Sequence, residues 1–128
     1  MTQPSAKEII SQYEGPLKID VEERPPSAVV LHLDGVLALD NSSKLRDRIS
    51  ELAKRHDLKK IVLDLGKLTY IDSSGIGTLV TSKTALRKNG TDLVLAQLTE
   101  KAQALVQITK LYTVFDVRDS VEQALSQA

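Results

Sequence analysis

The chain has 128 residues, with 17 Lys and Arg against 17 Asp and Glu, 41% hydrophobic residues and no Cys. This composition is typical of one small globular domain, and it excludes disulfide scaffolds, cysteine-based metal sites and thiol nucleophiles. The formal net charge of zero argues against nucleic acid as a partner, and no apolar stretch approaches the length of a membrane span. We therefore expect a cytoplasmic protein that binds neither nucleic acid nor a membrane.

The first 16 residues combine proline and glycine with polar side chains, and only Ile9, Ile10 and Tyr13 interrupt that pattern. We interpret residues 1–16 as an N-terminal arm with room for one helical turn, outside the folded domain.

Two strands joined by a turn are predicted next. Apolar and charged residues alternate over 17–22, which is the period of a strand with one solvent-exposed face. The prolines at 25 and 26 force a turn, and a mostly apolar run over 28–33 follows, ended by an Asp-Gly pair. We therefore expect an antiparallel hairpin whose first strand lies at the edge of a sheet.

The rest of the chain alternates helices with strands. Apolar residues at helical spacing predict helices over about 41–56, 73–89, 99–109 and 120–128, and short apolar runs predict strands at 61–65, 92–96 and 114–117. Because strand–helix–strand units form parallel crossovers, the predicted fold class is α/β. It is a single domain with a small mixed, largely parallel sheet and helices packed on it.

Catalytic and metal-binding motifs are missing from the sequence. The Gly-Ile-Gly at 75–77 lacks the third glycine of a dinucleotide fingerprint and the Gly-Lys-Ser/Thr end of a P-loop. No Gly-x-Ser-x-Gly nucleophile elbow surrounds Ser73 or Ser74. His32 and His56 have no carboxylate at ligand spacing, so we interpret them as a sheet residue and as a cation at a helix C-terminus. We expect no enzyme, no cofactor and no metal.

The segment 69–77, Thr-Tyr-Ile-Asp-Ser-Ser-Gly-Ile-Gly, stands between a predicted buried strand and a predicted helix, where open α/β sheets carry their functional surfaces. Asp, Ser and Gly are typical of a helix N-terminus, because side-chain oxygens accept hydrogen bonds from unpaired backbone N–H groups. Two adjacent hydroxyls exceed the need of a single cap, and glycine lets another backbone come close. We expect one hydroxyl of Ser73 and Ser74 to be free for a partner.

This segment resembles the signature of the STAS domain and, within it, of the bacterial anti-sigma factor antagonists. The string over 63–77, LDLGKLTYIDSSGIG, is similar to the family's strand, short loop and Asp-Ser-Ser/Thr-Gly-Leu/Ile-Gly helix start. The resemblance includes the Leu-Asp-Gly at 33–35 and the stretch 108–115. A STAS domain is therefore expected over 17–128, with only the arm outside it.

The resemblance also implies a function. In this family an unphosphorylated antagonist binds an anti-sigma factor that is also a serine kinase and so releases the sigma factor, and phosphorylation switches the antagonist off. The phosphate acceptor falls on Ser73. ATP and magnesium belong to the kinase, and a PP2C-type phosphatase restores the antagonist. The partner-binding positions implied beside the acceptor are Asp72, Ser74, Gly75, Ile76 and Gly77.

The chain departs from the family pattern at two places. Many antagonists carry Gly-Glu-Leu/Ile-Asp after the second strand, with carboxylates that help to engage the kinase, whereas this chain has Gly-Val-Leu-Ala at 35–38. Asp34 and Asp40 flank the gap, and we assign Asp40 to the partner surface as the substitute carboxylate. Lys110 stands where the family usually has glycine.

Two other functions stay open. A STAS domain can bind without being phosphorylated, as a scaffold in a sensory complex or as a regulator in a transporter assembly. A small-molecule-binding or catalytic domain is the third class, and it rests only on the helix N-terminus as an anion site.

Overall fold

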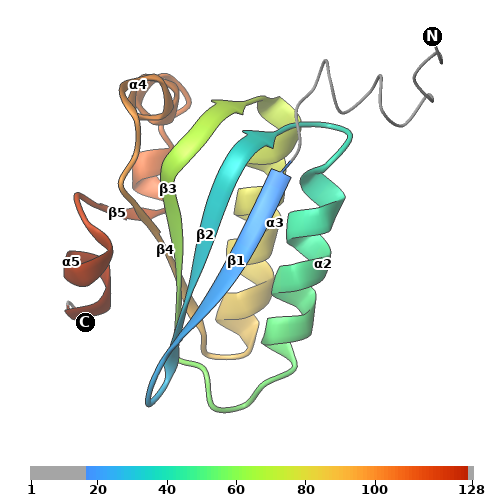
Figure 1. Ribbon diagram of the computed structural model, residues 1–128, viewed down its shortest axis with the longest axis vertical. Helices are drawn as coiled ribbons and strands as arrows, with labels where there is room; N and C mark the ends of the chain where they lie inside the picture. Colours follow the sequence, from blue (N-terminus) through green and yellow to red (C-terminus); the bar gives the residue numbers. More distant parts are fainter. Residues whose placement is uncertain (1–16, 127–128) are drawn as a thin grey trace, which may run out of the picture.

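The computed structural model describes residues 17–126, which form a five-stranded sheet between helices (Figure 1). The strands are β1 (Leu17–Arg24), β2 (Ala28–Leu37), β3 (Lys60–Ile71), β4 (Asp92–Ala96) and β5 (Asp116–Arg118). The helices are α2 (Ser42–Ala53), α3 (Ser73–Lys88), α4 (Glu100–Ile108) and α5 (Val121–Ser126), with a short 3-10 helix, η1 (Leu111–Thr113). The predicted arm, 1–16, lies outside the described residues.

The strands follow one another across the sheet in the order β1-β2-β3-β4-β5. The edge strand β1 is antiparallel to β2, and every later pair is parallel. The α/β class, the antiparallel hairpin and the largely parallel sheet predicted from the sequence are therefore confirmed. In the three central strands Leu31, Leu63 and Leu95 stand side by side, as the parallel register requires.

Helices lie on both faces of the central strands, which explains why the stretches 29–31, 61–63 and 93–95 are apolar and buried throughout. The larger core lies beneath α2 and α3, whose buried residues include Leu45, Ile49 and Leu79. A smaller cluster on the opposite face joins the central strands to Val121 and Ala124 of α5. None of the helices within 17–126 is long and apolar enough to cross a membrane.

Strands β2 and β3 continue well beyond their predicted ends, so the strand end expected at Asp34-Gly35 and the short loop expected after residue 65 were wrong. Gly35 has a φ of 112°, and the pairing between the two strands shifts register on either side of it. Glycine accepts this backbone conformation, so the strand continues through a bulge at this pair. The Thr69 hydroxyl donates to the Gly35 carbonyl oxygen at 2.9 Å, and pairing resumes up to Leu37 and Ile71.

The backbone at Lys110 explains why a glycine is expected there. Lys110 has φ 58° and ψ 28°, the left-handed conformation, between the end of α4 and η1. Glycine adopts this conformation without the steric penalty that a Cβ brings. Lys110 therefore adopts a left-handed conformation that is less favourable for a residue with a Cβ.

Candidate functional site

The entrance of α3 is organised by Asp72, which separates the helix from the end of β3. Its Oδ1 accepts a hydrogen bond from the Gly75 N–H at 2.9 Å, and its Oδ2 accepts one from the Leu39 N–H at 3.1 Å. The Asp72 carboxylate thus caps α3 and also holds the β2–α2 loop against the start of this helix. A negative charge is favourable at this position because the helix dipole places positive potential at the N-terminus.

Ser73 and Ser74 form the start of the first turn of α3. Ser73 is exposed and Ser74 is half-buried. Among the interactions of residues 17–126, neither hydroxyl makes a hydrogen bond or ion pair. Because Asp72 supplies the cap, the structure leaves both hydroxyls available to an outside molecule, where the sequence predicted one.

The two glycines of the motif have different surroundings. Gly75 is buried, and a Cβ built there would lie 2.7 Å from the Leu37 carbonyl oxygen and 2.8 Å from Ile71 Cγ1. The backbone that approaches Gly75 is therefore the chain's own β2. Gly77 is exposed, and a Cβ there would meet nothing within 4 Å. Packing within the described residues therefore does not require glycine at residue 77.

The β2–α2 loop lies beside the α3 entrance. Its Asn41 side chain accepts from the Ala38 N–H at 2.8 Å and donates to the Val36 carbonyl oxygen at 2.7 Å, which fixes the loop's shape. Asp40 is exposed in this loop, next to Leu39, which contacts Asp72. The structure therefore brings Asp40 close to the motif. Asp34 lies farther back along β2, in register with Lys67.

Sequence reasoning missed an apolar groove of about 320 Å³ between the end of β3 and α4. Tyr70 and Ile108 line it, and they are 57% and 79% exposed. Ile71 also lines the groove and stands two residues before Ser73, so the groove adjoins the α3 entrance. The signal in the sequence was a pair of large apolar side chains, at 70 and 108, that do not belong to the buried apolar faces of their strand and helix.

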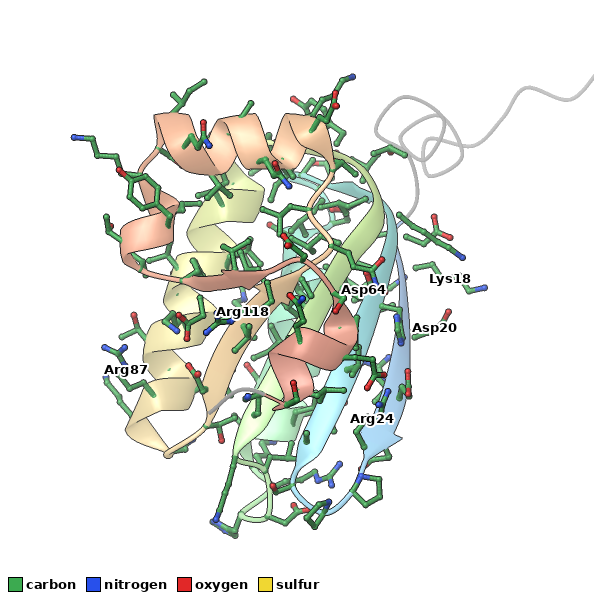
Figure 2. All side chains as sticks on the ribbon, turned by 90° about the vertical axis from the view of Figure 1, so that its left-hand side faces the viewer. Lys18, Asp20, Arg24, Asp64, Arg87 and Arg118 are labelled. Atoms are coloured by element: carbon green, nitrogen blue, oxygen red, sulfur yellow. The ribbon has the colours of Figure 1, made fainter. Side chains whose placement is uncertain are left out.

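A second feature that the sequence did not reveal lies on the sheet face that carries α5. His32 Nδ1 is 2.7 Å from Asp64 Oδ2, and His32 Nε2 is 2.7 Å from Glu22 Oε1. Three adjacent strands supply these residues, so sequence spacing alone gave no carboxylate near this histidine. Figure 2 shows Asp64 on this face, with Asp20 on the edge strand to one side and Arg118 to the other.

The two carboxylates change the protonation of His32. Partial burial by itself lowers the pKa of the imidazole, but the hydrogen bonds to Glu22 and Asp64 outweigh it and raise the pKa above the usual value of 6.5. The hydrogen bond from His32 is in turn the main reason why the pKa of Glu22 is lowered. The carboxylates contact opposite ends of the ring, and no cluster in 17–126 has the composition of a metal site.

Comparison with known proteins supports one family. The sequence model of the STAS domain family matches residues 18–124. BtrV of Bordetella bronchiseptica, provisionally named an anti-sigma factor antagonist, is 33% identical over 94 residues, which are 72% of this chain and 78% of that protein. The anti-sigma F factor antagonist of Paenibacillus polymyxa is 23% identical over 111 residues, 87% of this chain and 94% of its own.

The fold is also that of a solved relative. The structure of the Bacillus cell fate determinant SpoIIAA in its phosphorylated form superposes with a TM-score of 0.67 at 20% sequence identity. The match covers 84% of this chain and 96% of that one. At this identity the similarity establishes the fold.

Proposed function

The chain belongs to the STAS domain family, and from that membership we propose that it is an anti-sigma factor antagonist whose binding is switched by phosphorylation of Ser73. In its unphosphorylated form it binds an anti-sigma factor that is also a serine kinase, and the sigma factor is released. Because sigma factors act in transcription, we place this cycle in the cytoplasm. A PP2C-type phosphatase removes the phosphate and restores the antagonist.

The observation that carries this proposal is the exposed Ser73 hydroxyl at the N-terminus of α3, which has no partner among the described residues. In the transfer, Ser73 Oγ forms a bond to the γ-phosphorus of ATP held by the kinase, ADP leaves, and the hydroxyl proton passes to a base on the kinase. The antagonist therefore supplies the acceptor, and the partner supplies the nucleotide and the catalysis. SpoIIAA, which has the same fold, has been solved in a phosphorylated form.

Phosphate on Ser73 is compatible with the antagonist's own fold. The modification adds about −1.5 to −2 charges at pH 7, and a helix N-terminus favours an anion by roughly 0.3–1 kcal/mol. The nearby carboxylate of Asp72 offsets part of this gain. The larger effect falls on the complex, because a dianion buried in an interface without a matching cation costs several kcal/mol.

The proposed partner surface consists of the exposed and half-buried residues at the α3 entrance and in the β2–α2 loop beside it. Gly75 contributes by letting α3 pack against Leu37, and direct contact falls to its neighbours. Asp40 supplies a carboxylate from the loop that lacks the family's usual pair. The remaining contact residues are Asp72, Ser74, Ile76 and Gly77.

Phosphorylation by the purified anti-sigma factor kinase tests the proposal. We expect the parent chain and Ser74→Ala to take up one phosphoryl group from Mg-ATP, detected by mass spectrometry of the intact protein, and Ser73→Ala to take up none. Uptake by Ser73→Ala would move the switch to another residue. Binding of that kinase without phosphorylation of any variant would instead favour the scaffold function.

A further inference from the structure

The groove between β3 and α4 exposes apolar surface that the described chain does not cover. Leu68 and Ile71 line it from the strand, and Leu105 and Ile108 line it from the helix. Figure 1 shows α4 beside the end of β3, at the same end of the sheet where β1 begins. Exposed apolar patches of this kind mark contact surfaces, because each Å² removed from water contributes roughly 25 cal/mol.

The sequence of the arm matches such a groove. Ala6, Ile9, Ile10 and Tyr13 are spaced i, i+3, i+4 and i+7, which places them on one face of a helix. Ser5 and Glu8 have the spacing of a capping box, and Gly15 and Pro16 are typical of a helix end. The pattern favours an amphipathic helix of about two turns, with one apolar face to cover.

The arm is also attached at the right place. Leu17 pairs with Gly35, and Gly35 pairs with Leu68 at the edge of the groove. Two strand spacings of about 4.8 Å make this separation roughly 10 Å. The four-residue step from Tyr13 to Leu17 spans up to about 13 Å when extended. A helix over 6–13 is then about 12 Å long, close to the length of the nine-residue α4.

We propose that the apolar face of the arm, formed by Ala6, Ile9, Ile10 and Tyr13, docks into the groove between β3 and α4 of the same chain. Lys101 lines the groove, and the arm carries Glu8 and Glu14 beside its apolar residues, so the charges are complementary. A docked arm covers Tyr70, which lines the groove. The contact itself does not depend on the proposed phosphorylation of Ser73.

Paramagnetic broadening tests the contact, since the chain has no Cys and a single Ser11→Cys variant takes one spin label on the polar side of the arm. We expect strong broadening of the Tyr70 and Ile108 amides and little at Gly90, at the far end of α3. Equal broadening at Ile108 and Gly90 would overturn the proposal. Spin-labelled chains mixed with isotope-labelled, label-free chains give the second check, because broadening there would mean that a second copy provides the arm.

Matched variants of the arm identify the face that docks. In the spin-labelled chain, Ile9→Ser with Ile10→Ser is expected to abolish the broadening at Ile108, and Lys7→Ser with Gln12→Ser, on the polar side, to preserve it. These substitutions lie outside residues 17–126, so the spectrum of the domain itself serves as the folding control. Broadening that survives Ile9→Ser with Ile10→Ser would contradict an apolar contact.

Discussion

Asp72 and Ser73 divide the tasks that a helix start normally combines. The Asp72 carboxylate accepts from two backbone N–H groups, those of Leu39 and Gly75, so the helix cap and the loop brace use one side chain. Ser73 is thereby spared from capping and stands exposed. The sequence predicted that a cap would be present here, but an Asp-Ser-Ser string does not say which oxygen provides it. Only the geometry assigns the cap to the aspartate.

His32 gives the first prediction at the residue scale. Its raised folded-state pKa means that the charged contact with Glu22 stabilises the fold fully below the unfolded pKa of about 6.5, and that this contribution is lost as pH rises through the folded pKa. We expect Glu22→Gln to lower the free energy of unfolding at pH 5.5–6, and the difference from the parent to shrink toward pH 8.5. Urea unfolding at each pH measures it.

Glu23→Gln is the matched control for that series. Glu23 pairs with Arg55 at 2.8 and 3.0 Å, and a guanidinium keeps its charge throughout this pH range. The difference between parent and Glu23→Gln is therefore expected to stay constant with pH. A constant difference for Glu22→Gln as well would contradict a charged His32.

At the scale of the element, the two glycines of α3 allow a sharp comparison. Gly75→Ala forces a Cβ to 2.7 Å from the Leu37 carbonyl oxygen, so we expect it to lower the free energy of unfolding by about 1–3 kcal/mol. Gly77→Ala meets nothing and improves helix propensity, so we expect the same stability or a gain of up to about 1 kcal/mol. Chemical denaturation of both variants checks these values.

The same two variants, Gly75→Ala and Gly77→Ala, distinguish an effect on stability from an effect on partner binding. If Gly77 serves the partner surface, Gly77→Ala weakens binding to the anti-sigma factor although the fold is unharmed. Full binding by Gly77→Ala would remove residue 77 from that surface, and a stable Gly75→Ala would show that β2 and α3 do not pack as closely as described.

The lengths of the strands could not be predicted from the sequence. The apolar run over 61–65 predicted β3, but its extension to Ile71 depends on pairing with β2, in which Thr69 donates to Gly35. That partner is far away in the sequence, and a polar Gly-Lys pair at 66–67 is typical of a loop. Helix α3 was predicted closely because apolar periodicity and the Asn-Gly at 89–90 are both local signals.

At the scale of the whole molecule, the family signature predicted the fold and the position of the motif. Surfaces to which several elements contribute could not be predicted from the sequence. The His32 contacts come from three strands, and the groove needs the position of α4 against β3. Both depend on tertiary placement, for which sequence periodicity carries no information. The α3 entrance, the β2–α2 loop and α4 lie at one end of the sheet (Figure 1), and the groove lies between α4 and the end of β3. The proposed recognition is therefore concentrated at this end.

The most direct test of the central claim is the dissociation constant of the anti-sigma factor complex, measured by calorimetry for the parent, Ser73→Asp and Ser73→Ala. We expect Ser73→Asp to bind at least about tenfold more weakly, a loss of about 1.4 kcal/mol or more, while its melting temperature stays within a few degrees of the parent. Ser73→Ala is expected to bind like the parent. Binding by Ser73→Asp as tight as that of the parent would contradict a switch at Ser73.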